Sequence, residues 1–250
     1  MSLFSATECF LVTGASSGIG RAIALRLHEE GATVIANGRD TQRLEEICNI
    51  LQFSNRIHVV QRDLLDSMDG LTGWLKDICK HYGPLSGLVC AAGITWNSPM
   101  RFYPLDKAHL IFDICCHVPL LLGSAFCQKH NNIGNGASIV YIAAAASVQP
   151  NPGQGIYGAA KAALVAGARC QAMEFAKIGL RVNCISPGLV ETPMFDNTVK
   201  LLGQTFVDHE KALYPLGFGK PSDVADLATF LLSQRARWLT GQNIVLSGGR

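Results

Sequence analysis

Charged residues are scarce in this sequence: Asp, Glu, Lys and Arg make up 16 % of its 250 residues and leave a formal net charge of only +2. It also lacks any basic run or basic patch interleaved with aromatic residues. The chain therefore offers no electrostatic attraction to nucleic acid or to an anionic membrane, and we expect neither as a partner. Apolar residues make up 48 %, which excludes a disordered chain and favours layers around a deeply buried sheet.

The sequence also lacks cysteines at the C-x-x-C spacing. The nine cysteines are scattered without a C-x-x-C pair, and the seven histidines do not cluster with them at the spacings of metal ligands. Such a pattern is typical of a reducing compartment, where thiols behave as small apolar side chains. The N-terminal residues show no charged leader and no stretch long enough to span a bilayer. We expect a soluble, cytoplasmic protein without a bound metal.

Repeats, linkers and low-complexity segments are also lacking, so residues 1–250 are expected to form a single domain. Buried-strand patterns alternate with helical ones. Strands are predicted at 9–13, 32–36, 56–61, 85–92, 138–143, 180–185 and 243–246, and helices at 21–30, 41–51, 67–82, 105–129, 157–177 and 221–233. This alternation predicts an α/β fold with right-handed crossovers and a parallel sheet. Residues 194–214 show loose amphipathy, which predicts a mobile helical lid over a cleft, at about 190–215.

A glycine-rich loop follows the first strand directly and precedes a helix. Strand, loop and helix N-terminus in this order form an anion site, because backbone N–H groups point at a phosphate that comes close where no Cβ intervenes. The context predicts a bound dinucleotide. Its expected contacts in the loop are Gly14, Ser16, Ser17, Gly18, Ile19 and Gly20.

The end of the second strand reads Asn37-Gly38-Arg39-Asp40. An acid here binds the ribose 2′-hydroxyl of NAD, whereas an arginine suits the 2′-phosphate of NADP. Because Gly38 stands where the acid is expected and Arg39 follows it, NADP is favoured and NAD is less favoured. In the alternative, Arg39 only caps the next helix and Asp40 is a competing acid displaced by two positions.

Two later strand ends also carry candidate cofactor contacts. Asp63 follows the third strand, where its carboxylate can accept a hydrogen bond from an adenine amino group or serve as an ordinary N-cap for the helix at 67–82. Gly93 closes the fourth strand, and without a side chain its backbone can approach a ligand.

Tyr157 and Lys161 open the helix after the fifth strand. They are four residues apart, so the phenol and the ammonium share one helix face. A cation close to a phenol favours the phenolate and brings the pKa of the tyrosine closer to neutrality, which suits an acid or base catalyst. The alternative is an aromatic anchor followed by a solvated lysine.

The long helix at 105–129 contains Cys115-Cys116-His117-Val118-Pro119. Proline has no N–H to donate to the carbonyl four residues earlier, so the Cys115 carbonyl is expected to be free and the helix to kink. His117 is expected to be a packed or surface histidine.

Six features occur in order along the chain: Thr13-Gly14-x-x-x-Gly18-x-Gly20, Asp63, Ala91-Ala92-Gly93, Tyr157-x-x-x-Lys161, Pro187-Gly188 with Thr192, and a last strand followed by Gly-Gly. Over essentially its whole length the chain resembles the short-chain dehydrogenase/reductase family, in particular its 3-oxoacyl-carrier-protein-reductase-like ketoreductases. The resemblance implies a Rossmann-type, doubly wound sheet of seven parallel strands with helices on both faces, a nicotinamide cofactor, and a homotetramer or homodimer.

The resemblance also implies residue roles. Tyr157 would exchange a proton with the substrate oxygen, while Lys161 would hold the nicotinamide ribose and lower the tyrosine's pKa. Further cofactor contacts implied by the family's motifs are Leu64, Ala91, Ala92, Gly93, Pro187, Gly188, Val190 and Thr192.

Two departures from the family pattern fall in the catalytic set. The family's serine, thirteen positions before the tyrosine, is Ala144 here. Ser147 would replace it only with a rebuilt loop, and Ser138 lies at the opposite end of the strand. The family's asparagine aligns with Cys115, whose main-chain carbonyl would still hold the water of the proton relay. Three explanations of Ala144 are open: a slow or specialised enzyme, a non-catalytic relative, or an engineered alanine, with natural divergence the simplest.

The sequence thus predicts an NADP(H)-dependent oxidoreductase that interconverts a small-molecule carbonyl and a secondary alcohol. Alternatives are a sensor or scaffold that binds NADP(H) without redox chemistry, and an isomerase or lyase on the same fold. Five side chains suggest an apolar substrate pocket, or else simply lid packing: Trp96, Met100, Phe102, Phe195 and Phe206.

Overall fold

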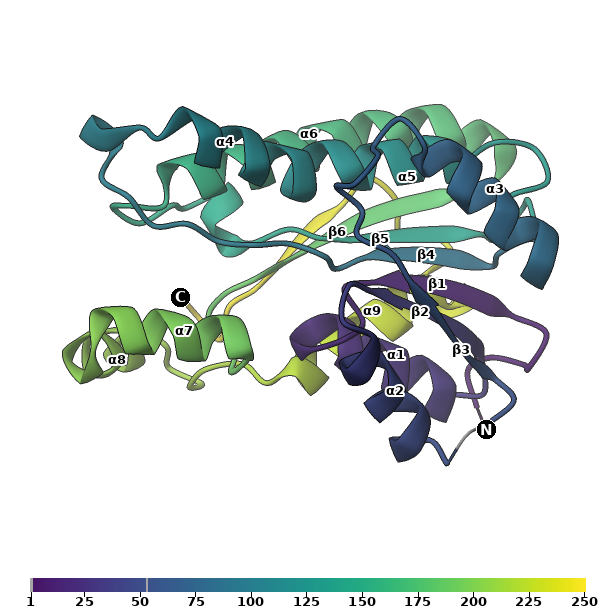
Figure 1. Ribbon diagram of the computed structural model, residues 1–250, viewed down its shortest axis with the longest axis horizontal. Coiled ribbons are helices and arrows are strands. Elements are labelled where there is room, and N and C mark those ends of the chain that lie inside the picture. Colours follow the sequence, from purple (N-terminus) through teal and green to yellow (C-terminus); the bar gives the residue numbers. More distant parts are fainter. Residues whose placement is uncertain (1, 53) are drawn as a thin grey trace.

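Seven parallel strands form one sheet in the order β3-β2-β1-β4-β5-β6-β7 in the computed structural model, which describes residues 2–52 and 54–250 (Figure 1). The strands are β1 Cys9–Thr13, β2 Thr33–Gly38, β3 Ile57–Gln61, β4 Gly87–Cys90, β5 Ser138–Ile142, β6 Arg181–Pro187 and β7 Asn243–Leu246. The order reverses between β1 and β4, and in such sheets ligands bind at the carboxyl ends of the strands at this point. The predicted doubly wound sheet is confirmed.

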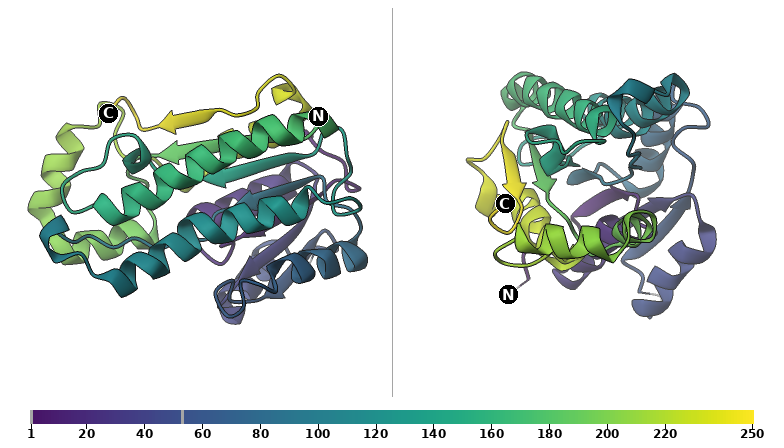
Figure 2. Two further views of the ribbon diagram at one scale, coloured as in Figure 1. Left: turned by 90° about the horizontal axis from the view of Figure 1, so that it is seen from above. Right: turned by 90° about the vertical axis from the view of Figure 1, so that its left-hand side faces the viewer.

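Helices cover both faces of the sheet, which explains why β1, β4, β5 and β6 are buried along their whole length (Figures 1 and 2). One face carries α1 Gly18–Glu29, α2 Thr41–Ile50 and α9 Pro221–Leu232. The other carries α3 Leu71–Tyr82, α4 Leu105–Phe112, α5 Val118–Phe126 and α6 Gly155–Phe175. Short 3-10 turns occur at Met100–Phe102, Ala145–Ser147, Ala176–Ile178 and Gln234–Ala236.

The predicted helix at 105–129 is interrupted and ends earlier than expected. Between α4 and α5 lies a π-helical turn, Asp113–His117, in which the Val118 N–H donates to the Asp113 carbonyl five residues earlier. Pro119 follows directly and has no N–H, which explains why the regular hydrogen-bond ladder fails here. The irregularity predicted from Pro119 is therefore present as a π turn.

The stretch Leu105–Phe126 is long enough and, at a mean hydropathy of 1.6, apolar enough to cross a membrane by length and composition. More than half of its most apolar window is buried inside the protein. Ile111, Val118 and Leu122 pack in the core between this stretch and the sheet. The stretch is accounted for as a core helix.

The predicted lid is two helices rather than one. α7 Pro193–Leu202 and α8 Gln204–Ala212 are separated by Gly203, whose φ of +81° is a conformation that favours glycine. Thr192 caps α7 by accepting from the Phe195 N–H at 3.2 Å. Both helices project beyond the carboxyl ends of the strands, beside the C-terminal residues (Figures 1 and 2).

Candidate active site

Two cavities adjoin at the carboxyl edge of the sheet. The smaller, of about 360 Å³, lies over the glycine-rich loop, and the larger, of about 960 Å³, lies between α6 and the lid helices. Because they share lining residues, the two cavities form one continuous site. The residues that line both cavities are Ile19, Ala91, Gly93, Thr192 and Met194.

The glycine-rich loop is packed too tightly to carry side chains at two positions. A Cβ on Gly14, where φ is +66°, would lie 2.6 Å from the Ala92 backbone nitrogen, and one on Gly20 would lie 2.3 Å from the Gly14 carbonyl oxygen. α1 begins at Gly18 rather than at the predicted residue 21, so the loop runs straight into the helix N-terminus. Every residue predicted for this contact lines the smaller cavity: Gly14, Ser16, Ser17, Gly18, Ile19 and Gly20.

Arg39 lies at the rim of the smaller cavity with its side chain 68 % exposed and Nη1 3.5 Å from Asp63 Oδ2. It does not cap α2, because the Asp40 side chain does so by accepting from the Arg43 N–H at 3.1 Å. The alternative in which Arg39 is a helix cap is therefore wrong, and the Asp40 carboxylate is occupied as the N-cap of α2. Arg39 remains available to an anion at this end of the cavity.

Asp63 also lines the smaller cavity, with Leu64 beside it. Its Oδ1 accepts from the Leu65 N–H at 3.0 Å, and the helix that follows begins later than predicted, at Leu71 with Gly70 as N-cap. The interpretation of Asp63 as an ordinary N-cap is wrong.

Asn37, which the sequence analysis did not single out, lies deeper in the smaller cavity. Its Nδ2 donates to the Val60 carbonyl, and its Oδ1 is buried without a hydrogen-bond partner among residues 2–52 and 54–250. A buried acceptor without a partner is costly unless a ligand supplies a donor. The only sequence signal for this residue is an amide inside an otherwise apolar strand.

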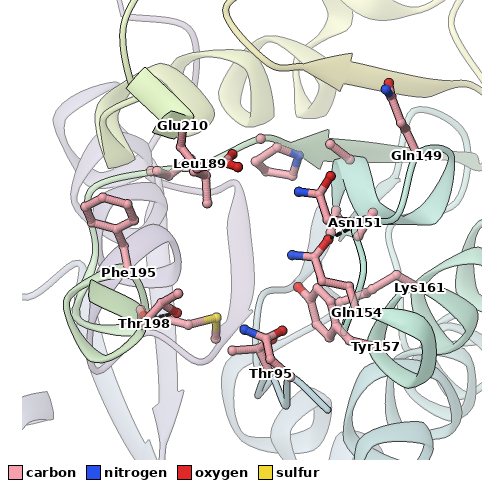
Figure 3. Close-up of a pocket in the computed structure, with 18 of the residues that line it drawn as sticks. Thr95, Gln149, Asn151, Gln154, Tyr157, Lys161, Leu189, Phe195, Thr198 and Glu210 are labelled. Carbon is pink, nitrogen blue, oxygen red and sulfur yellow. Dashed lines mark hydrogen bonds between the residues drawn. The ribbon is translucent and has the colours of Figure 1, made fainter. Parts of the chain in front are cut away.

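Tyr157 and Lys161 stand on the first turns of α6, and both line the larger cavity (Figure 3). Lys161 is buried at 4 % exposure, and its Nζ donates to the Ile142 carbonyl at the end of β5 over 2.7 Å. The ammonium lies 5.9 Å from the centroid of the Tyr157 ring. The alternative of a solvated lysine is therefore wrong.

The pKa of Tyr157 is raised, whereas the sequence predicted that it would be lowered. Burial raises it above its ordinary value, and the neighbouring Cys115 thiol raises it further. The predicted lowering by Lys161 is not seen, because burial of the phenol dominates its pKa. Near neutrality the phenol is therefore protonated and can donate a proton.

Cys115 packs behind the site rather than lining it. Its Sγ donates to the Ile94 carbonyl at 3.4 Å, and the side chain is fully buried. A Cβ on Gly93 would lie 3.6 Å from this sulfur and 3.7 Å from Lys161 Nζ. The fold thus brings together Cys115, Gly93 and Lys161, three residues far apart in the sequence.

Ala144 lines the larger cavity at the end of β5, and its neighbours Ala143, Ala145 and Ala146 line it too. Ser147 does not compensate. Its hydroxyl lies 3.2 Å from that of Ser186, which itself donates to Asn243 Oδ1. Replacement of the family's serine by Ser147 is therefore excluded in this conformation.

The remaining predicted residues divide between the cavity wall and its surroundings. Pro187, Gly188, Val190 and Thr192 line the larger cavity, and Ala91 and Ala92 line the smaller. Among the predicted apolar side chains, Met100, Phe195 and Phe206 line the larger cavity. Trp96 and Phe102 do not, and both are exposed, so their assignment to the pocket is wrong.

A cluster of polar residues lining the larger cavity was missed by the sequence analysis. Glu210 of α8 is buried and ion-paired with Arg250, whose Nη2 donates to Asn151 Oδ1 over 3.0 Å. These three residues come from segments separated by up to 99 positions, so no local pattern signals them. Over residues 2–52 and 54–250, no group of three or more His, Cys, Asp and Glu side chains is placed to hold a metal ion.

Comparisons with known proteins show the family to which the chain is similar. The family model described as enoyl-(acyl carrier protein) reductase matches residues 14–250. A 3-oxoacyl-[acyl-carrier-protein] reductase of Rickettsia felis is 32 % identical, with 96 % of this chain and 95 % of that protein covered. A short-chain dehydrogenase/reductase structure from Brucella melitensis superposes with a TM-score of 0.89 at 29 % identity, covering 100 % and 98 % of the two chains.

A short-chain dehydrogenase from Burkholderia cenocepacia, solved in complex with NADP, has a TM-score of 0.88 at 26 % identity and 97 % coverage of both chains. Family model, relatives and structures span nearly the whole chain. The chain belongs to the short-chain dehydrogenase/reductase family of oxidoreductases.

Proposed function

We propose that this protein is an NADP(H)-dependent ketoreductase that interconverts a carbonyl and a secondary alcohol. The observation that carries the proposal is the position of Tyr157 and Lys161 on the wall of the larger cavity, where it adjoins the cavity over the glycine-rich loop. The names of the relatives support it, since several are 3-oxoacyl reductases and one similar structure holds NADP.

The residues present fit a dinucleotide. Gly14 and Gly20 leave room that a Cβ would fill, the Ser17 hydroxyl is not used to cap α1, and Asn37 offers a buried acceptor without a partner in the described structure. Gly18 and the α1 N-terminus would hold the phosphates. When bound, the nicotinamide supplies or accepts the hydride.

Tyr157, the protonated phenol in the larger cavity, would transfer the proton. In the reducing direction it donates to the substrate oxygen as negative charge develops there. Lys161, fixed by the Ile142 carbonyl, places a positive charge beside the reacting atoms and would hold the nicotinamide ribose. The proton relay through the Cys115 carbonyl remains part of this proposal.

Ala144 removes one donor that the family normally directs at the substrate oxygen. Loss of one preorganised donor typically costs about 10²- to 10³-fold in rate. We therefore propose a slow or specialised enzyme. Ala144, together with Cys115 in place of the family's asparagine, also favours a second candidate, a sensor or scaffold that binds NADP(H) without redox chemistry.

We further propose a cytoplasmic homo-oligomer. All nine cysteines are free thiols, in keeping with a reducing compartment. Leu110, Leu121 and Met173 are exposed apolar side chains on α4, α5 and α6, the paired helices that the family uses for assembly. Light scattering at several protein concentrations measures the oligomeric state.

Arg39→Ala should weaken NADPH binding at least about tenfold and leave NADH binding nearly unchanged, because only NADPH carries a 2′-phosphate for the guanidinium. Titration of both cofactors measures the two affinities. Arg43→Ala is the matched control: Arg43 pairs with Asp40 on α2 and lies outside the cavity. Equal losses for NADPH and NADH in Arg39→Ala would make Arg39 merely structural.

The raised pKa of Tyr157 predicts opposite pH dependences for the two directions of reaction. Reduction uses the protonated phenol, so kcat/KM should stay level between about pH 6 and pH 9. Oxidation uses the phenolate, whose fraction rises with pH below the pKa, so its kcat/KM should increase over the same range. An oxidation rate that is level or falls over this range would assign the base to another group.

The function is tested by following NADPH absorbance with the natural protein and a panel of simple ketones and 3-oxoacyl thioesters. Turnover of at least one carbonyl class, with the alcohol identified as product, is expected. NADPH binding without turnover of any class would instead favour the sensor or scaffold.

A further inference from the structure

Two carboxamides stand on the same wall of the larger cavity as the Tyr157 phenol. Figure 3 shows Gln154 and Asn151 on the side of Tyr157, facing Leu189, Phe195 and Thr198 across the cavity. An amide NH₂ is a strong hydrogen-bond donor that stays neutral at every working pH. This wall therefore carries donors even though Ala144 carries none.

The orientation of the Gln154 carboxamide is fixed by its neighbour. Its side-chain oxygen Oε1 accepts from the Asn151 backbone N–H at 3.0 Å. A backbone N–H can only donate, so the atom facing it must be the oxygen and the NH₂ group must point the other way. In Figure 3 that NH₂ group is directed into the cavity, on the side of the Tyr157 hydroxyl.

Gln154 is the N-cap residue of α6, three positions before Tyr157. Its side chain makes no cap hydrogen bond, and its Nε2 donates to no residue in the described parts of the chain. The position is rigid, because the Gln154 N–H donates to the Asn151 carbonyl and the Gly158 N–H donates to the Gln154 carbonyl.

Asn151 is itself held in place from the lid side. Its Oδ1 accepts from Arg250 Nη2 at 3.0 Å. Arg250 is ion-paired with the buried Glu210, and its guanidinium lies 5.3 Å from the centroid of the Tyr214 ring. A connected polar network thus runs from α8 through Arg250 and Asn151 to Gln154, and such second contacts hold a donor in one orientation.

Other polar groups near the site are less suited to replace the serine. The Ser147 hydroxyl faces Ser186, behind the wall. Asn97 also lines the cavity, but no hydrogen bond in the described structure fixes which way its carboxamide points, and its oxygen is buried without a partner there. Gln149 stands apart from Tyr157, at the edge of the cavity (Figure 3).

We propose that Gln154 is a catalytic residue that donates a hydrogen bond from Nε2 to the substrate carbonyl oxygen, in the role left open by Ala144. This inference rests on the proposed ketoreductase function. The hydride reaches the carbonyl carbon, the proton on the new hydroxyl comes from Tyr157, and the carboxamide keeps both of its protons throughout. Asn151 and Arg250 are positioning residues for this donor.

The first test is Gln154→Met, which keeps the length of the side chain and removes the donor. We expect kcat for carbonyl reduction to fall about 100-fold while NADPH affinity is unchanged. Gln128→Met, the same change at an exposed glutamine outside both cavities, is the control and should retain wild-type kcat. Wild-type kcat in Gln154→Met would overturn the proposal.

The second test combines this change with Ala144→Ser. If the two groups serve the same oxygen, Ala144→Ser should raise kcat only a few-fold in the natural protein and about 100-fold in Gln154→Met. Equal gains in both backgrounds would mean independent roles and overturn the proposal. So would a failure of Ala144→Ser to rescue Gln154→Met, because the loss would then come from a disturbed loop.

Failure of the proposed function looks different in these experiments. In that case the natural protein, with NADPH bound, turns over no carbonyl, and neither Ala144→Ser nor Gln154→Met changes this. Turnover by the natural protein that is insensitive to Gln154→Met leaves the function standing and removes only the role of Gln154.

Discussion

Tyr157→Phe should lower kcat for carbonyl reduction by about 10³-fold or more and leave NADPH affinity within about twofold of the natural protein. The phenol lines the larger cavity and is protonated near neutrality, so it can supply the proton that the substrate oxygen requires. Phenylalanine keeps the ring that packs at the start of α6 and removes only the acid. Steady-state kinetics and a cofactor titration measure the two effects.

Tyr103→Phe is the control, because Tyr103 is exposed and lies outside both cavities. It should behave as the natural protein does. Retention of a tenth or more of the natural kcat by Tyr157→Phe would mean that another group supplies the proton.

Gly20→Ala should reduce NADPH affinity at least about 100-fold, equivalent to about 3 kcal/mol. The added Cβ would lie 2.3 Å from the Gly14 carbonyl oxygen, so the loop and the start of α1 must move apart. That movement removes the close approach of backbone N–H groups to a phosphate. Cofactor titration and thermal unfolding with and without NADPH measure the loss.

Gly73→Ala is the matched control for this change. Gly73 lies inside α3, and a Cβ there meets nothing within 4 Å. Alanine should stabilise the helix by about 0.5–1 kcal/mol and leave NADPH affinity unchanged. A Gly20→Ala protein that binds NADPH normally would contradict the assignment of this loop to the phosphates.

The fold was largely predictable because its signals are local. Each central strand, such as β1 and β5, is a continuous apolar run, and both faces of the sheet are covered. The element ends were less predictable. α3 begins at Leu71 rather than at residue 67, and the lid divides at Gly203 because a glycine there adopts a left-handed conformation.

The candidate site was predictable where its residues follow strand ends or share one helix face. The glycine-rich loop, Arg39 and the Tyr157/Lys161 pair all line the two adjoining cavities. The polar network that links Arg250, Asn151 and Gln154 was not predictable, because the contact between Arg250 and Asn151 spans 99 positions. No spacing rule in the sequence brings these two residues together.

The charge state of Tyr157 could not be predicted from spacing either. A lysine four positions after a tyrosine suggests a lowered pKa of the phenol, but burial dominates at Tyr157 and raises that pKa. Whether a cation or burial dominates depends on where the ammonium points, which only the folded structure shows.

The most direct test of the central claim, that this chain reduces carbonyls although Ala144 replaces the serine, is a single turnover with NADPH deuterated at the transferable position of the nicotinamide. The natural protein is mixed with this cofactor and a 3-oxoacyl thioester or ketone that it binds. We predict that deuterium appears on the carbinol carbon of the product and that Tyr157→Phe slows this transfer by about 10³-fold or more. Bound deuterated NADPH that transfers no deuterium to any carbonyl would contradict the account.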